Sequence, residues 1–169
     1  VSPDGYQVFN VHKDAGIAYP GLKCGLLGHY QRKNTVTLLA AIDQLRHAGM
    51  QISDKMVYAG IRNVIRNTSL AGRWQVMGEH PLIVCDTAHN ADGLAQVLNQ
   101  VRETSFRQLH MIVGFVNDKD TGSIMTMLPS DAISSFTRPS VPPTLHETEL
   151  MERAAAAGIK GNPYGNIAD

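Results

Sequence analysis

Polar side chains that could bind a ligand follow directly after an apolar segment near the middle of the chain. The run from Leu82 to Cys85 is uninterrupted and apolar, which is typical of a strand covered on both faces. Asp86, His89 and Asn90 come next. In open α/β sheets, ligands bind just outside the carboxyl ends of strands, where loop groups and helix N-termini converge. The spacing therefore predicts a binding site at this strand end.

Each of these side chains also has a structural interpretation. Asp86 can accept hydrogen bonds from two ribose hydroxyls, or it can be a capping or loop carboxylate. His89 can act as a donor, an acceptor or a phosphate partner near neutral pH, or it can be solvated. Asn90 can orient His89 or make local turn hydrogen bonds. Asp92 stands where we expect a helix cap.

Two further groups lie near predicted strand ends. Arg73 follows Gly72 at a strand start, where a guanidinium can hold a phosphate or a carboxylate through two hydrogen bonds; a surface arginine is the alternative. We expect Trp74 to pack. The run 118–120, Asp-Lys-Asp, follows the apolar strand that ends near Phe115. Such a run is usually a solvated turn, but its position makes it a second candidate.

Alternating strands and helices must position these groups. We expect strands at 73–77, 81–86, 109–115 and 132–137, and helices at 92–104, 121–128 and 146–157. Gly158 is placed to end the last helix. The pattern predicts an α/β fold with a Rossmann-like, mostly parallel sheet flanked by helices. The first two strands, joined through Gly78 and Glu79, are close enough to form an antiparallel hairpin at an edge. No closing strand is evident after Gly161.

The first part of the chain has another pattern. Residues 6–9 and 17–19 are β-prone and predict a hairpin or edge strands. A helix capped by Asn34 should run to Gly49, and a second should start at Ser53 or Asp54. The polar residues 67–69 suggest a boundary. We therefore expect two domains, at 1–67 and 68–169, with the second lacking its end.

Composition narrows the class of protein. The 169 residues are 43% hydrophobic and 18% charged, and the 15 basic residues balance the 15 acidic ones. This balance gives no support to nucleic-acid or acidic-membrane binding. No apolar run approaches the roughly 20 residues that a membrane helix needs. Cys24 and Cys85 lie far apart, and we expect reduced thiols, with Cys85 in the core, and a cytoplasmic location.

Several binding motifs are missing. The sequence has no GxxxxGK[ST] phosphate loop, no GxGxxG after a strand, no HExxH or CxxC spacing and no GxSxG. Without GxxxxGK[ST], the chain cannot bind a triphosphate through a phosphate loop. Without GxGxxG after a strand, a nicotinamide-binding function has less support. We expect no metal site built from this chain alone.

Four blocks of the sequence resemble motifs of one family. Gly28-His29-Tyr30-Gln31 with Asn34 resembles G-x-[HY]-Q-x-x-N-A, and Gly72-Arg73 resembles P-G-R. Asp86-Thr87-Ala88-His89-Asn90 with Gly93 resembles D-x-A-H-N-x-x-G, and Val113-Gly114 with residues 118–120 and Leu128-Pro129 resembles G-x-x-x-D-K-D … L-P. The order and spacing resemble the C-terminal part of folylpolyglutamate and dihydrofolate synthases, within the Mur ligase superfamily. Thr35 and Ala71 depart mildly from the pattern, and Pro142-Pro143-Thr144 replaces a common arginine.

The resemblance implies an ATP-dependent amide ligase. In the family, ATP phosphorylates a substrate carboxylate and the amine of glutamate attacks the acyl phosphate. By position, Asn34 would contact the adenine, Arg73 the phosphates and Asp86 the ribose. His89 and Asn90 would lie beside the phosphates and the incoming glutamate, with His89 and Arg73 as the catalytic pair.

The same resemblance implies substrates and limits. Folate or dihydropteroate, L-glutamate and ATP would be the small-molecule partners, and the family's phosphate loop and Mg²⁺ ligands lie upstream of residue 1. We expect a monomer that is inactive by itself. Two alternatives stay open: the C-terminal region of a peptidoglycan Mur ligase, and a non-catalytic α/β domain that binds a nucleotide or a protein.

Overall fold

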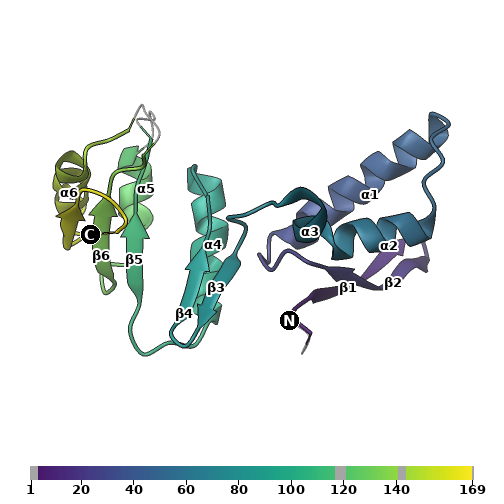
Figure 1. Ribbon diagram of the computed structural model, residues 1–169, viewed down its shortest axis with the longest axis horizontal. Coiled ribbons are helices and arrows are strands. Elements are labelled where there is room, and N and C mark those ends of the chain that lie inside the picture. Colours follow the sequence, from purple (N-terminus) through teal and green to yellow (C-terminus); the bar gives the residue numbers. More distant parts are fainter. Residues whose placement is uncertain (1–3, 117–120, 141–143, 169) are drawn as a thin grey trace. The chain divides into compact units, whose positions relative to one another are not determined.

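The computed structural model describes residues 4–116, 121–140 and 144–168. Its helices and strands form two compact units, Val1–Thr87 and Ala88–Asp169 (Figure 1), each with its own hydrophobic core. Of the candidate residues, 118–120 lie outside the described residues, as do Pro142 and Pro143. The division into domains at 67 and 68 stays a prediction.

The first unit starts with the expected hairpin. Strand β1 (Gln7–Lys13) pairs antiparallel with β2 (Gly16–Cys24), and both are longer than the β-prone pieces at 6–9 and 17–19. The helices of this unit are α1 (Gln31–His47), α2 (Asp54–Arg62) and the short α3 (Val64–Thr68) (Figure 1). Apolar side chains of β2, α1 and α2 form the core: Tyr19, Leu22, Cys24, Leu39, Val57 and Ile61.

Helix α1 begins one turn earlier than the sequence suggests. Its N-cap is Tyr30, and Asn34 lies inside the first turn, where its amide donates to Gln31 Oε1 over 2.9 Å. The expectation that Asn34 caps this helix is therefore wrong. Main-chain bonds from the Gln31 amide to the Gly28 carbonyl (2.9 Å) and from the Arg32 amide to the His29 carbonyl (3.2 Å) occupy the first donors instead. The expected start of α2 is confirmed: the helix begins at Asp54, and Ser53 Oγ caps it by accepting from the Met56 amide.

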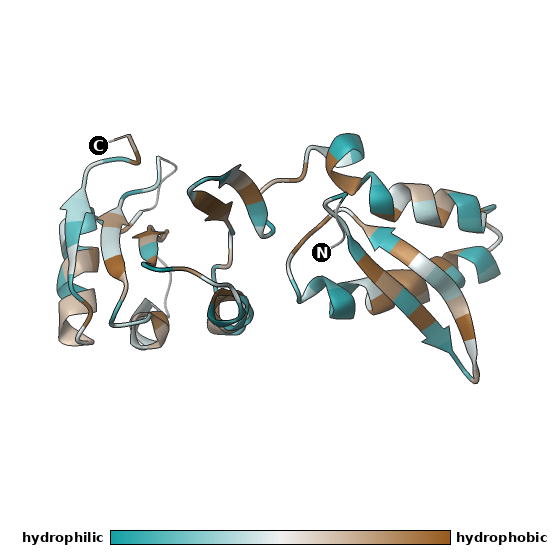
Figure 2. Cartoon of the chain, turned by 90° about the horizontal axis from the view of Figure 1, so that it is seen from below, coloured by the Kyte–Doolittle hydropathy of each residue, from teal (hydrophilic) through white to brown (hydrophobic). Residues whose placement is uncertain are grey.

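The second hairpin of this unit is antiparallel, as predicted. It pairs β3 (Gln75–Glu79) with β4 (Leu82–Cys85) (Figure 1). In Figure 2 β4 is hydrophobic throughout, whereas β3 also has hydrophilic residues. Leu82 is nevertheless 50% and Ile83 49% exposed. The prediction of a strand covered on both faces is wrong for the described structure, because β3 and β4 form a sheet of two strands. Cys85 is a free thiol, as expected, but it is only half-buried.

The second unit contains a parallel sheet of three strands in the order β5-β6-β7. Its strands are β5 (His110–Val113), β6 (Ile133–Thr137) and β7 (Gly161–Tyr164), and its helices are α4 (Ala91–Glu103), α5 (Thr121–Met127) and α6 (Glu147–Ala156). Side chains from all three helices and from β5 and β6 share one core, in which Phe136 and Leu150 are fully buried. This α/β architecture, a parallel sheet flanked by helices, confirms the predicted fold class.

Strand β7 was not predicted. It pairs with β6 from Ser134↔Gly161 to Thr137↔Tyr164, although it contains a glycine and a proline. Pro163 is tolerated because β7 lies at the edge of the sheet, where one missing N–H need not break a ladder. The end of α6 does follow the prediction, since Gly158 has a φ of +80° just beyond the last turn.

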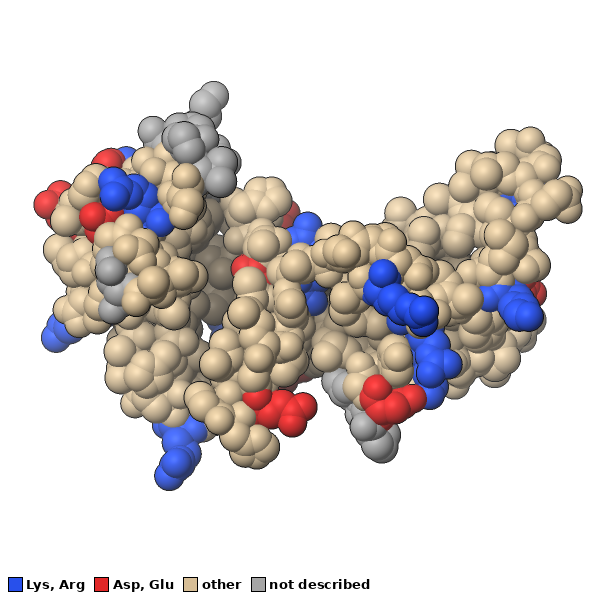
Figure 3. All heavy atoms as spheres, in the orientation of Figure 1, with Lys and Arg blue, Asp and Glu red and all other residues tan. Residues whose placement is uncertain are grey.

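The described residues contain no helix long and apolar enough to cross a membrane. On the face drawn in Figure 3, basic and acidic side chains form several small groups of either sign. This pattern agrees with the zero net charge of the sequence.

Candidate functional site

The Asp86 carboxylate is held at the end of β4 by two donors. Its Oδ2 accepts a hydrogen bond from the Tyr30 hydroxyl over 2.8 Å and another from the Trp74 backbone amide over 2.7 Å. Asp86 is half-buried. Two donors on one oxygen restrict the rotation of a carboxylate, so the structure presents Asp86 in a defined orientation.

The loop that leads into β3 is built around this carboxylate. Gly72 has a φ of +69° and Trp74 a φ of +50°, which is uncommon for a residue with a side chain. The Trp74 side chain is 8% exposed, so its expected packing role is confirmed. The Thr87 amide and hydroxyl both donate to the Gly72 carbonyl, over 2.9 and 3.1 Å. These contacts hold the backbone in the conformation that aims the Trp74 amide at Asp86.

Arg73 lies between Gly72 and Trp74 in this loop. Its Nη1 donates to the Thr87 hydroxyl, and more weakly to the Gly72 carbonyl over 3.4 Å. Burial and Asp86 raise the pKa of Tyr30, and the positive charge of Arg73 offsets a small part of that rise. The structure thus brings Arg73 and Asp86, predicted from separate motifs, to the same hairpin base.

Tyr30 is the member of this cluster that we did not predict. Burial is the main cause that raises the pKa of its hydroxyl above the usual value, and the hydrogen bond to Asp86 is the second. The hydroxyl therefore stays protonated and able to donate at neutral pH. The only sequence signal was its place beside Gln31 in the first motif, because 56 residues separate Tyr30 from Asp86.

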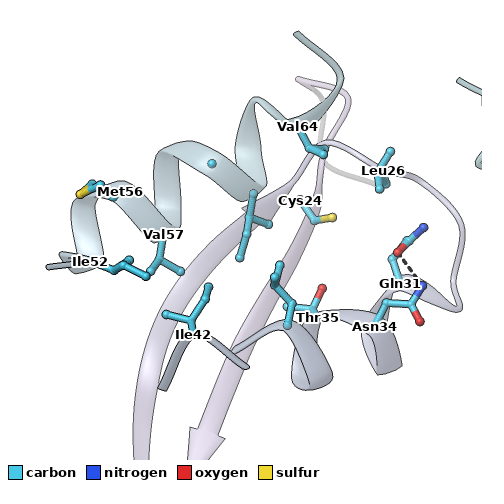
Figure 4. Close-up of a pocket in the computed structure, with 13 residues that line it drawn as sticks. Cys24, Leu26, Gln31, Asn34, Thr35, Ile42, Ile52, Met56, Val57 and Val64 are labelled. Atoms are coloured by element: carbon cyan, nitrogen blue, oxygen red, sulfur yellow. Dashed lines mark hydrogen bonds between the residues drawn. The ribbon is translucent and has the colours of Figure 1, made fainter. Parts of the chain in front are cut away.

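Asn34 lies at the edge of an apolar cavity of about 540 Å³ in the first unit. Figure 4 shows Asn34 and Gln31 joined by their hydrogen bond at one end, and Ile52 and Met56 at the other. Side chains of β2, α1 and α2 make up most of the wall between these ends. Asn34 is thus one turn of α1 away from Tyr30, next to an apolar surface.

His89 and Asn90 belong to the second unit, at the start of α4. Asn90 is the N-cap of this helix, and its Oδ1 accepts from the Gly93 amide over 2.8 Å. Of its two predicted roles, the local hydrogen bond is the one observed. The expectation that Asp92 caps the helix is wrong; Asp92 lies in the first turn, where its charge suits the helix dipole. His89 directly precedes the cap and is exposed.

The candidate residues therefore fall into two groups. Arg73, Asp86 and Tyr30 belong to the first unit, whereas His89 and Asn90 belong to the second. In the first unit Tyr30 bonds to Asp86, and Arg73 bonds to Thr87, the next residue. Within residues 4–116, 121–140 and 144–168, no cluster of three or more His, Cys, Asp or Glu side chains could hold a metal ion.

Comparison with known proteins places this arrangement in a family. Residues 72–168 match the family described as Mur ligase, glutamate ligase domain. A probable bifunctional folylpolyglutamate synthase/dihydropteroate synthase of Haloferax volcanii is 36% identical over 107 residues, which are 63% of this chain and 12% of the relative. The folylpolyglutamate synthase of Lacticaseibacillus casei is 27% identical over 156 residues, 84% of this chain and 36% of the relative.

A solved structure shows the same fold. The folylpolyglutamate synthase of Mycobacterium tuberculosis, complexed with ADP and AMPPCP, superimposes with a TM-score of 0.76 and 25% identity over 91% of this chain and 34% of that protein. The chain thus spans little more than a third of these relatives at most. The family match covers more than half of the chain, and the parallel sheet agrees with it. The chain therefore belongs to the Mur ligase family and contains its glutamate ligase domain.

Proposed function

We propose that this chain is the C-terminal part of an ATP-dependent ligase that adds L-glutamate to folate, or to dihydropteroate in a bifunctional form. The observation that carries the proposal is that Arg73, bonded to Thr87, and an oriented Asp86 both lie at the base of one hairpin. A guanidinium and a carboxylate in that position provide complementary partners for the phosphates and the ribose of one nucleotide.

The chemistry assigns a task to each residue. ATP would phosphorylate the acceptor carboxylate, and the amine of glutamate would displace phosphate from the acyl phosphate to form the amide. Arg73 would stabilise the charge that builds up on the transferring phosphoryl group. Asp86 would accept hydrogen bonds from the ribose, and Asn34 would contact the adenine beside its apolar surface. His89 and Asn90 would face the phosphates and glutamate.

The Mg²⁺ that such chemistry uses needs oxygen ligands. As the family resemblance implies, we propose that those ligands lie in the part of the relatives that this chain does not span. We also propose that the chain is inactive by itself. A monomeric state and a cytoplasmic location are part of the proposal.

The peptidoglycan ligase alternative has less support, because the relatives and the solved enzyme described above carry the folylpolyglutamate synthase name. The non-catalytic alternative differs in what it says about the complete protein. A coding sequence with a GxxxxGK[ST] loop ahead of Val1 would favour the ligase, whereas its absence from the natural gene would refute the proposed activity.

A binding experiment on this chain tests the nucleotide site directly. NMR titration with ADP and with adenosine should show weak binding, with the dissociation constant for ADP above about 1 μM, and a preference for ADP. Arg73→Ala should reduce that preference about tenfold, because a charged hydrogen-bond donor to phosphate is lost. Arg66→Ala, which removes an exposed arginine of α3, is the control. Equal binding of ADP and adenosine by the unmodified chain would refute the assignment of Arg73.

A further inference from the structure

We propose that Tyr30 is a positioning residue that fixes the Asp86 carboxylate in the orientation needed to meet the ribose hydroxyls. The ribose contact rests on the proposed function, whereas the hold on Asp86 does not. Tyr30 itself would touch neither the nucleotide nor the reacting atoms.

The hydrogen-bond geometry around the carboxylate carries the proposal. The Tyr30 hydroxyl and the Trp74 amide both donate to Oδ2, over 2.8 and 2.7 Å. With a single donor, the carboxylate could pivot about that bond. Donors from two directions fix Oδ2 and thereby the direction in which Oδ1 lies. Hydrogen bonds to charged groups are stronger than neutral ones, so the loss of either donor should loosen the carboxylate.

The Tyr30 ring lies against Gly28, and the backbone segment before it is anchored by hydrogen bonds. A Cβ added at Gly28 would lie 2.6 Å from Tyr30 Cζ, so only a glycine lets the ring lie against the backbone there. The Gln7 side chain, which is 8% exposed, donates to the carbonyls of Leu26 and Gly28 over 2.7 and 2.9 Å. These bonds anchor the segment that leads into α1. The hydroxyl therefore comes from a rigid support, which is what a positioning group requires.

Tyr30 also stays a donor over a wide pH range. Partial burial and the Asp86 carboxylate raise its pKa, so the phenol stays protonated to a higher pH than an ordinary tyrosine. An ionised phenol would repel the carboxylate. The environment thus preserves the one protonation state in which this contact is attractive.

The alternative is that Tyr30 only ties α1 to the β3–β4 hairpin. If Tyr30 is only a structural tie, loss of its hydroxyl should loosen all the hydrogen bonds at the hairpin base. If Tyr30 positions Asp86, the loss should loosen only the hydrogen bonds made to Asp86. The Trp74 amide reports on the second case because it bonds to the Asp86 oxygen. The Thr87 amide, bonded to the Gly72 carbonyl over 2.9 Å, reports on the first.

The test uses Tyr30→Phe in this chain, which removes only the hydroxyl. Tyr58→Phe is the matched control, because the Tyr58 hydroxyl also donates to a distant acceptor, the Pro20 carbonyl, over 2.9 Å. Amide hydrogen exchange followed by NMR should show about tenfold faster exchange at the Trp74 amide in Tyr30→Phe, with the Thr87 amide unchanged. Tyr58→Phe should leave both amides as they are.

Nucleotide analogues then test the ribose contact. The unmodified chain should bind ADP about tenfold better than 2′,3′-dideoxy-ADP, and Tyr30→Phe should reduce this ratio at least threefold. Faster exchange at Trp74 without any ribose preference in the unmodified chain would refute the proposed nucleotide role of Asp86 and leave the hold on Asp86 intact. Unchanged exchange at Trp74, or equal acceleration at Thr87, would overturn the positioning role.

A second variant covers the case in which Tyr30→Phe fails to fold. Asp86→Asn removes the charge that helps to raise the pKa of Tyr30. A pH titration of the Tyr30 ring carbons should then show ionisation at lower pH than in the unmodified chain. An unchanged Tyr30 titration would show that the two side chains do not interact, and the proposal would fall.

Discussion

Gly72 and Thr87 hold the base of the β3–β4 hairpin together: the amide and the hydroxyl of Thr87 both donate to the Gly72 carbonyl, over 2.9 and 3.1 Å. Gly72 has a φ of +69°, and a Cβ at this position would collide with the Thr87 side chain. The same backbone aims the Trp74 amide at Asp86. A glycine that is required both by its φ and by a close neighbour is therefore part of the candidate site.

We predict that Gly72→Ala lowers the free energy of unfolding by about 1–3 kcal/mol, because strained backbone and a steric clash add. Urea unfolding followed by the fluorescence of Trp74, the single tryptophan, measures this change. Gly60→Ala is the control, since a Cβ on that exposed α2 residue meets nothing within 4 Å. Stability equal to that of Gly60→Ala would contradict the role of Gly72.

The helix α4 offers a direct choice between two caps. Asn90→Ala should cost about 1 kcal/mol, because the Gly93 amide loses its acceptor. Asp92→Ala should cost about 0.5 kcal/mol or less, because it removes only a favourable charge from the first turn. Unfolding of the two variants, followed by circular dichroism under identical conditions, gives both values. The reverse order would mean that Asp92, the cap expected from the sequence, is the true one.

The positions of the candidate residues in the fold were largely predictable, because they depend on short-range patterns. An apolar run followed by Asp86, His89 and Asn90 indicates a strand end and a helix start whatever surrounds them. The hairpin, the helices of the second unit and the glycine that ends α6 follow from the same kind of pattern. Whether other elements cover a strand could not be predicted in this way. Leu82 and Ile83 are exposed, although leucine and isoleucine are also the residues typical of a buried strand.

Contacts between distant segments could not be predicted in this way. The Tyr30–Asp86 hydrogen bond joins residues 56 positions apart, and no periodicity in either segment reflects the other. Strand β7 has a related cause, since Gly161 is required by the neighbouring strand and not by β-propensity. The first turn of α1 shows a third cause: main-chain carbonyls accept from the first amides of the helix, so the helix begins before Asn34 without a side-chain cap.

Gly161 provides a steric prediction in the second unit. A Cβ there would collide with the Ser134 carbonyl and the Phe136 ring, and Phe136 is fully buried. We expect Gly161→Ala to lower the free energy of unfolding by about 1–3 kcal/mol through overpacking. Gly122→Ala in α5, where a Cβ meets nothing within 4 Å, should be neutral or stabilising. A neutral Gly161→Ala variant, measured by urea unfolding, would show that β7 does not approach β6 closely.

The Tyr30 hydroxyl makes stability depend on alkaline pH. The pKa of this hydroxyl is raised in the folded chain, first by burial and then by Asp86. A tyrosine in the unfolded chain ionises at about pH 10. The folded state therefore holds this proton more tightly. Its contribution to stability is complete below about pH 10 and is lost as the pH rises from there towards the folded pKa. Urea unfolding at about pH 8, 9.5 and 10.5, two values below and one above the tyrosine pKa of about 10, should show stability falling at the highest pH. Tyr30→Phe should reduce this decline and Tyr58→Phe should not; an equal decline in both variants would assign it to other groups.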